Sequence, residues 1–512
     1  MRSIIESFGS GVAFQYSSVI ALFLSSSFFY FFIAHILPVN IVGSISLLYA
    51  IINIVTSIFM FGMAGGIQHY ISYHLTRENY KALLKLIRET SIFGLILSLL
   101  AFVIIFLLSP YIAILFFHSY SYTLSIKIIS IAIATGVLIN IFSSILLGLS
   151  QYKKYSIIYV FVNTFTYFFP LLLLVIYGKA TYLIMGVSII NTVNAALFIT
   201  FVYKAYKKYK YKNSDTYVEP YKNVIYYSIP LFFSSIIGTS ATYIDRIVVS
   251  YFINLSYLGI YNFALIVATA ATFTVYPISN LLIPKLSSFF SLDNKSAFSE
   301  GIVILINIVS LLYIPASLGI AALSGIILYI FAGPAYEIAS IPLMIIMFTG
   351  SIFISGTIYR AGISSVRKTR IFVLSAGFSL ESNLLLSIIL IPAFNIIGAA
   401  ISYSSMSVVS FIILYYYARK LGIANYDKIR VVKIWAAALI MFFILFFVQS
   451  AFPYTLLNVF IYILLGIFIY VLEIKFFKLI SRKEMNYLLY IIPKRFTLIK
   501  NILISLSFNE KN

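Results

Sequence analysis

The sequence predicts an all-α protein that crosses a membrane about 14 times. Of its 512 residues, 62% are hydrophobic and only 10% are charged, whereas soluble domains carry roughly 25% charged residues. The mean hydropathy is +1.04. Runs of about 20 apolar residues, the length needed to cross a hydrocarbon core of ~30 Å, recur from end to end. A membrane β-barrel would instead show short segments of alternating hydrophobicity.

The predicted spans follow one another with short connections, except for one long basic segment after the sixth span. They are 11–34, 41–63, 90–109, 122–148, 155–177, 181–203, 223–251, 257–283, 298–320, 338–359, 371–391, 396–418, 431–451 and 455–474. The N-terminal residues run directly into the first span without a small-residue cleavage site, so no removable signal peptide is expected.

The distribution of basic residues predicts the orientation of the chain. The formal net charge is +21. With the N-terminus inside, all but three of the 35 Lys and Arg residues fall in inner segments; the exceptions are Lys127, Lys179 and Arg246. Cytoplasmic segments collect Lys and Arg because such segments resist translocation. The charge therefore predicts a cell-membrane protein with both termini in the cytoplasm, with membrane lipids rather than nucleic acid as partners.

Two short motifs occur twice in the chain at nearly the same separation. LPVNIVG (37–43) matches INLSYLG (253–259) at an offset of 216, and GLSQYKKY (148–155) matches GISSVRKT (362–369) at an offset of 214. Two landmarks at one spacing indicate an ancestral duplication of six spans. Because six is even, the copies share an orientation, as in transporters with parallel repeats.

The duplication predicts the domain organisation. We expect an N-terminal six-helix lobe at 1–203, a basic cytosolic linker at 204–222, a C-terminal six-helix lobe at 223–420, helices 13 and 14 at 421–480, and a basic cytosolic tail at 481–512. The linker is rich in Lys and Tyr and is typical of a flexible solvated connection. Gly43 and Gly259, which end the two matching loops, are expected at equivalent places in the two lobes.

Several stretches together resemble a known family. They are YIDRIVVSYFINLSYLGIYNFA (243–264), YPISNLLIPKLSSF (276–289), SILLGLSQYKKYSI (144–157), RAGISSVRKTRIF (360–372) and ESNLLLSIILIPAFNIIGAAISY (381–403). Over roughly residues 5–475 the chain is similar to the polysaccharide-exporter branch of the multidrug/oligosaccharidyl-lipid/polysaccharide flippase superfamily. The resemblance implies two six-helix lobes around a central cavity. It also implies a flippase that moves lipid-linked oligosaccharide from the inner to the outer leaflet. Fourteen spans resemble this branch better than the related drug exporters, which have twelve.

Polar residues inside the spans are the candidate substrate-binding residues, because such residues are costly in a membrane. They include Arg246, Asp245, His69, Gln15 and Asn53. We expect Arg246 to face the cavity and stabilise a substrate phosphate, and Asp245 to find its own partner on another helix, because helix neighbours point ~100° apart. The alternative is that Arg246 extends to the outer head groups and only sets depth.

The other three candidates also have two interpretations. A protonated His69 imidazole is suited to meeting phosphate at the cytosolic entrance, whereas a purely interfacial position would give it no such role. The amides of Gln15 and Asn53 can line a cavity or simply bond neighbouring helices.

Glu381 is the candidate ion-coupling residue, because it lies close to the middle of span 371–391. No P-loop is present to hydrolyse ATP, so a gradient must drive transport. A carboxyl group that is neutral in one state and charged in another can couple transport to protons or sodium. The alternative is a permanently protonated carboxyl bonded to a neighbouring helix.

The composition argues against an enzyme and against a cofactor or metal. Only 14 residues are acidic, no two of them lie within three positions of each other, and there is no cysteine. Paired carboxylates for metal or base chemistry, Cys-ligated zinc and thiol catalysis are therefore not expected. The alternative function is an ion-coupled exporter of drugs or small molecules with the same architecture.

Overall fold

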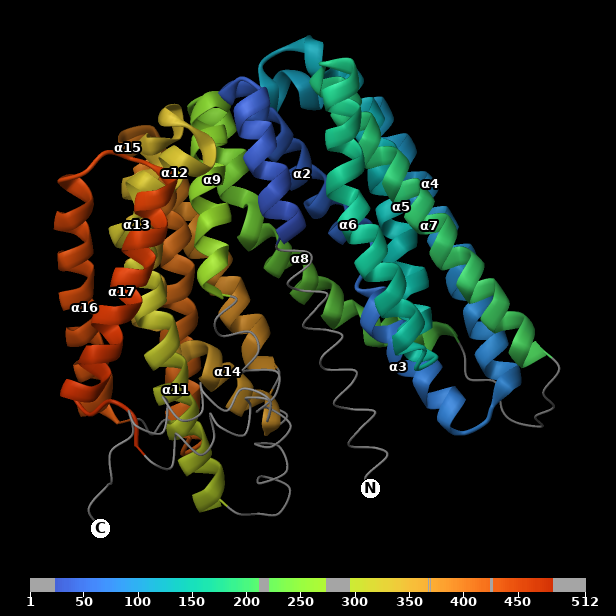
Figure 1. Ribbon diagram of the computed structural model, residues 1–512. Coiled ribbons are helices and arrows are strands. Elements are labelled where there is room, and N and C mark those ends of the chain that lie inside the picture. Colours follow the sequence, from blue (N-terminus) through green and yellow to red (C-terminus); the bar gives the residue numbers. More distant parts are fainter. Residues whose placement is uncertain are drawn as a thin grey trace. The chain divides into compact units, whose positions relative to one another are not determined.

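The computed structural model describes residues 24–210, 221–272 and 295–481, apart from 367, 369 and 424–426. Contacts between helices divide the chain into two compact units, Met1–Gly259 and Ile260–Asn512. Both units are built from long helices (Figure 1). The first part of span 11–34, most of linker 204–222 and nearly all of tail 481–512 lie outside the described residues.

The first unit is a bundle in which α4, α5 and α7 pack side by side and α3 packs on α4, α5 and α8 (Figure 1). Its helices are the apolar segment Leu24–Ile36, α2 (Val39–Phe59), α3 (Met63–Thr76), α4 (Tyr80–Phe117), η1 (Tyr120–Tyr122), α5 (Thr123–Gly148), α6 (Tyr152–Tyr177), α7 (Ala180–Lys210), α8 (Tyr221–Phe252) and the first turn of α9 (Leu255–Thr272). Ile67 and Ile71 of α3 join Leu83 of α4 and Ile145 of α5 in one buried apolar cluster.

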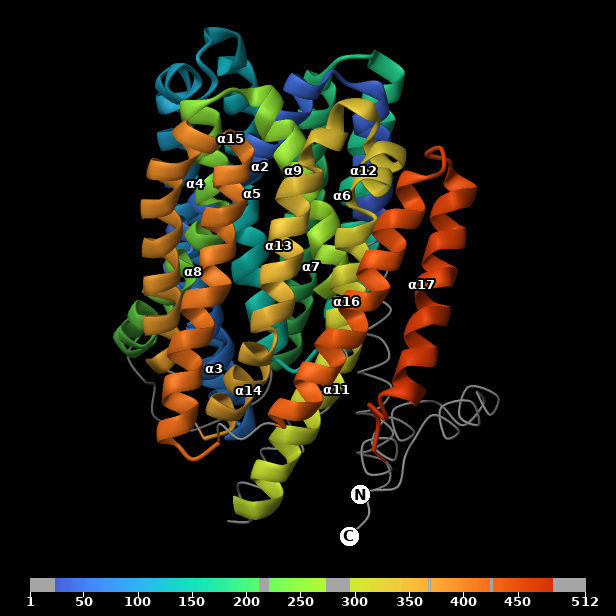
Figure 2. The same ribbon diagram turned by 90° about the vertical axis from the view of Figure 1, so that its left-hand side faces the viewer.

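The second unit is arranged around α11, which packs against α13 and α16. It contains the rest of α9, α11 (Lys295–Ala322), α12 (Ser324–Ala332), η2 (Pro334–Ala339), α13 (Ser340–Phe353), α14 (Ser355–Ser365), α15 (Arg370–Lys420), α16 (Lys428–Ser450) and α17 (Leu456–Phe476). Figure 2 shows α16 and α17 side by side as an antiparallel pair next to α11.

The prediction of a helical multi-pass membrane protein is confirmed, but the number of spans is not. Ten helices of the described chain are long and apolar enough to cross a membrane. One of them, α15, covers two of the predicted spans, 371–391 and 396–418. Asn395, with φ 51° and ψ −132°, interrupts the helix between these two spans. The predicted span 338–359 is also divided, into α13 and α14. The figure of 14 therefore stays a prediction.

Two glycines bring the start of α2 against the start of α9. A Cβ added to Gly43 would collide with the carbonyl oxygen of Leu255 and would lie 2.9 Å from the Gly259 nitrogen. A Cβ added to Gly259 would collide with the carbonyl oxygen of Val39 and would lie 3.0 Å from the Gly43 nitrogen. The contact is reciprocal, since each glycine faces the residue four positions before the other.

This reciprocal contact joins residues that are 216 positions apart, the offset at which the two loops match in the sequence. Reciprocal contacts of this kind are what a local two-fold relation produces. The contact thus supports an equivalence between the two loops, whereas the division into two six-helix lobes at 1–203 and 223–420 stays a prediction.

We expect Gly43→Ala to destabilise the protein, because its Cβ would meet backbone atoms that have no side-chain freedom to move aside. Overpacking of this kind costs about 1–3 kcal/mol. The control is Gly238→Ala in α8, where an added Cβ meets nothing within 4 Å and alanine favours the helix by about 1 kcal/mol. Thermal unfolding of the detergent-purified variants measures both, and equal melting temperatures for the two variants would contradict the close contact.

Candidate functional site

One face of α3 lines a cavity of about 550 Å³. Its residues recur every three or four positions, the spacing that places side chains on one helix face. The lining residues are Gly65, Gln68, His69, Ser72, Tyr73, Thr76 and Arg77. The opposite face carries Met63, Ile67 and Ile71, which are buried in the core of the first unit. Helix α3 is therefore amphipathic, with its polar face turned to the cavity.

Close packing on α8 fixes the position of α3. The chain turns between α2 and α3 through Phe61 and Gly62, which have φ values of 48° and 63°. A Cβ on Gly62 would collide with the backbone of Phe232 in α8, and one on Gly66 would collide with the hydroxyl of Ser228. Because small residues let helices approach closely in a membrane, this turn and these glycines hold the cavity face in place.

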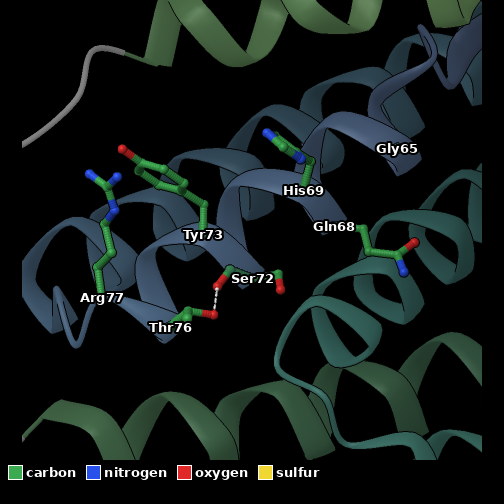
Figure 3. Close-up of a pocket in the computed structure, with 7 residues that line it drawn as sticks. All are labelled: Gly65, Gln68, His69, Ser72, Tyr73, Thr76 and Arg77. Carbon is green, nitrogen blue, oxygen red and sulfur yellow. Dashed lines mark hydrogen bonds between the residues drawn. The ribbon is translucent and has the colours of Figure 1, made fainter. Parts of the chain in front are cut away.

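The cavity side chains form two adjacent rows along α3 (Figure 3). His69, Tyr73 and Arg77 make one row, and the Arg77 Cζ lies 4.3 Å from the centre of the Tyr73 ring. In the second row the Thr76 hydroxyl donates a hydrogen bond of 2.8 Å to the Ser72 carbonyl oxygen. The arrangement offers a guanidinium stacked on an aromatic ring, beside an exposed imidazole.

The chemistry of this face suits an anion that carries polar groups. The described residues that line the cavity include a guanidinium, an imidazole, an amide and three hydroxyls, and they include no carboxylate. A guanidinium binds phosphate through paired hydrogen bonds, while amides and hydroxyls can donate to and accept from sugar hydroxyls. The face can therefore hold both a phosphate and the hydroxyls of a sugar.

Asp245 and Arg246 form an ion pair on α8, while the expected partner of Asp245 on another helix stays a prediction. The Asp245 side chain is fully buried, and its Oδ1 lies 3.8 Å from the Arg246 Nη1. The guanidinium turns back along its own helix, where Nη1 donates 2.7 Å to the Thr242 carbonyl oxygen and Cζ lies 4.8 Å from the Tyr243 ring centre. The length of the Arg side chain allows this return, although adjacent helix positions diverge.

The other predicted residues that the structure describes do not line the α3 cavity. The Asn53 amide donates 2.8 Å to the Tyr49 carbonyl oxygen within α2, and Gln15 lies outside the described residues. Glu381 is exposed on the first half of α15, whereas Asn383 is fully buried and its amide lies 3.5 Å from the Met406 sulfur. Among the described residues of the candidate set Arg246, Asp245, His69, Asn53 and Glu381, only His69 lines the α3 cavity.

Sequence reasoning missed most of this face. Arg77 was counted among the basic residues that mark the inner side of the membrane, and Ser72, Tyr73 and Thr76 were not singled out. The signal that could have found them is the helical spacing of polar residues in GIQHYISYHLTR (66–77). That stretch lies between the predicted spans 41–63 and 90–109.

Solved structures of other membrane proteins share this fold. The lipid II flippase MurJ in an inward closed conformation has a TM-score of 0.70 at 18% identity, over 91% of this chain and 98% of that one. An inward-facing multidrug transporter of the MATE family, in the MOP superfamily, has a TM-score of 0.63 at 11% identity, over 80% of this chain and 94% of that one. The chain thus has the fold of multi-pass membrane flippases and transporters.

The chain belongs to the polysaccharide biosynthesis protein family, whose profile matches residues 12–341. This places it in the polysaccharide-exporter branch of the MOP flippase superfamily, as the sequence motifs indicated. An uncharacterised membrane protein of Methanocaldococcus jannaschii is 24% identical over 390 residues, which is 70% of this chain and 74% of that protein.

Two further relatives match over shorter lengths. The capsular polysaccharide biosynthesis protein CapF of Staphylococcus aureus is 27% identical over 42% of this chain and 53% of its own. The probable low-salt glycan biosynthesis flippase Agl15 of Haloferax volcanii is 26% identical over 38% of this chain and 40% of its own. The match thus spans about half of either relative. The family and the structural neighbours are flippases and transporters rather than enzymes.

We expect Asp245→Asn to destabilise the protein by about 3–5 kcal/mol, because it removes one partner of a buried ion pair. Arg246→Gln alone likewise removes the ion-pair partner of Asp245. The double variant removes both charges. The double variant should therefore be more stable than the sum of the two single changes predicts. Thermal unfolding in detergent measures the stability of the two single variants and of the double variant. Strictly additive losses of stability would show that the two side chains are not coupled.

Proposed function

We propose that this protein moves lipid-linked oligosaccharide from the cytoplasmic to the outer leaflet by alternating access. Membership in the polysaccharide-exporter branch supports the class of substrate. The observation that carries the proposal is the α3 face, where His69 and Arg77 lie with hydroxyl and amide groups and where no carboxylate is found among the described lining residues.

The substrate chemistry fits this face. A lipid-linked oligosaccharide has a phosphate-bearing, hydrated head group that must leave water and a tail that stays in hydrocarbon. Moving that head group through the bilayer is costly unless polar groups replace its water. Arg77 would bind the phosphate, His69 would add a second donor in the same row, and the Tyr73 ring would offer a flat surface for a sugar.

The distribution of basic residues supports a cytoplasmic position for this site. Arg77 ends α3, and Lys81, Lys85 and Arg88 follow it at the start of α4. Such clusters mark cytoplasmic segments. In the proposed orientation, with both termini in the cytoplasm, the α3 cavity opens at the inner leaflet, where lipid-linked oligosaccharides would first meet the protein.

An ion-coupled exporter of drugs or small molecules is the second candidate function. Its support is the fold that the chain shares with MATE-family transporters. The two functions predict different phenotypes, because a drug exporter protects cells from toxic cations without changing their surface glycans.

Deletion of the gene should make lipid-linked oligosaccharide accumulate on the cytoplasmic leaflet while surface glycan falls. Wild-type protein should restore surface glycan, whereas Arg77→Gln and His69→Ala should restore much less, because each removes a group that we assign to the phosphate. Lectin staining of intact cells measures the surface glycan. Arg88→Gln is the matched control, since this exposed residue of α4 does not line the cavity.

Full restoration by Arg77→Gln at equal protein abundance would show that the α3 face does not bind the substrate. Unchanged surface glycan in the deletion strain, together with new sensitivity to cationic drugs, would favour the exporter instead.

Glu381 remains the candidate for coupling transport to protons or sodium. Glu381→Gln keeps the shape of a protonated carboxyl, so a purely structural Glu381 predicts an almost silent change, whereas a coupling role predicts transport that no longer responds to the gradient. The measurement is substrate flux in proteoliposomes under imposed pH or sodium gradients, with Glu78→Gln outside the spans as control. A response as strong as in wild type would show that Glu381 is not the coupling residue.

A further inference from the structure

The second unit has a cavity of its own, with a volume of about 560 Å³. The end of α9 and parts of α11, α13, α14 and both halves of α15 form its walls. The described residues that line it include one cation, Arg360, and no carboxylate. The cavity therefore has the same charge character as the α3 face, although different helices build it.

Arg360 lines this cavity from α14. Its Cζ lies 5.0 Å from the Phe372 ring centre. Among the residues that the structure describes, no carboxylate forms an ion pair with it. A guanidinium beside an aromatic ring keeps its hydrogen-bond donors available, and Arg360 carries the one charge among the described residues that line the cavity. Both facts favour an anion as the missing partner.

Hydroxyl groups line the same cavity from positions that the fold fixes. The Ser375 and Ser410 hydroxyls lie 2.9 Å apart, and the Ser379 hydroxyl donates 3.2 Å to the Met406 carbonyl oxygen, so these serines join the two halves of α15. Ser379 and Ser410 also line the cavity. Both serines therefore lie on the cavity wall where the two halves of α15 meet.

The hydroxyl of Tyr313 reaches the cavity from α11. A Cβ added to Gly350 of α13 would lie 3.0 Å from that hydroxyl, so the glycine makes room for it. Ser407 adds a further hydroxyl from α15, on the wall that already carries Ser410. The cavity thus combines one guanidinium, from α14, with several hydroxyls from α11 and α15.

We propose that this cavity is a second anion site, which binds the phosphate of a lipid through Arg360 with hydroxyl donors from α11 and α15. A guanidinium binds a phosphate through paired, charge-assisted hydrogen bonds, and hydroxyls complete the remaining oxygens. The phosphate can belong to a lipid-linked substrate, in which case the site deepens the proposed function. It can also belong to a bilayer lipid with the same chemistry.

The test measures binding of farnesyl diphosphate to purified protein in phosphatidylcholine nanodiscs. Because the α3 face is expected to bind the same probe, all variants are made in an Arg77→Gln background. There, Arg360→Gln should weaken binding about tenfold or more, since hydrogen bonds to charged groups contribute about 1.5–3 kcal/mol. Arg360→Lys keeps the charge but loses the paired hydrogen bonds. Its affinity for farnesyl diphosphate should therefore fall between that of the Arg77→Gln background and that of the Arg360→Gln derivative.

Arg419→Gln is the matched control, because Arg419 is an exposed residue at the end of α15 that does not line the cavity. Its affinity should equal that of the background, and thermal unfolding checks that each variant is folded. Affinity unchanged by both Arg360→Gln and Arg360→Lys would overturn the site.

A second arm distinguishes the two sources of phosphate. This arm repeats the measurement in nanodiscs that contain phosphatidylglycerol. If the phosphate of this bilayer lipid occupies the cavity, it competes with farnesyl diphosphate there. The affinity for farnesyl diphosphate should then fall more in the Arg77→Gln background than in its Arg360→Gln derivative. An equal fall in affinity in the two proteins would show that the bilayer lipid does not compete at Arg360, and would assign the site to the lipid-linked substrate. A protein that binds through Arg360 but moves no glycan would contradict the proposed function and leave this site intact.

Discussion

Close approach of backbone to backbone at a few glycines is the constraint on which the described first unit depends. Lipid is as apolar as the helices, so helices associate in a membrane through packing and hydrogen bonds. Gly43 and Gly259 let the starts of α2 and α9 touch, while Gly62 and Gly66 let α3 lie against α8. Since α3 follows α2 after a short turn, these contacts determine where His69 and Arg77 point.

The polar side chains of the protein fall into two groups with different consequences. Asn53 and Asn383 have contacts within their own helices or between helix halves, as structural amides do. Arg77 and Arg360 instead line cavities, and no described lining residue of either cavity carries a carboxylate. A cation on a cavity wall where the described residues include no carboxylate points to an anionic ligand, because a guanidinium binds phosphate through paired hydrogen bonds.

The sequence predicted the fold well and the site poorly, for physical reasons. Long apolar runs must become helices in a bilayer, because each backbone group needs an internal partner. Periodicity alone does not show the break at Asn395 or the turn at Phe61 and Gly62, both of which depend on local backbone angles and tertiary contacts. Arg77 and Arg360 sit at span ends, where topology alone explains a basic residue, so only the folded structure reveals that they line cavities.

The central claim is that the protein itself moves a lipid-linked oligosaccharide across a bilayer. The most direct measurement places purified wild-type protein in proteoliposomes with a lipid-linked oligosaccharide confined to the inner leaflet, and follows its cleavage by an external glycosidase. The account predicts that cleavage proceeds with wild-type protein and stays near the protein-free level with Arg77→Gln. Cleavage at the protein-free rate with folded wild-type protein, under every imposed ion gradient, would contradict it.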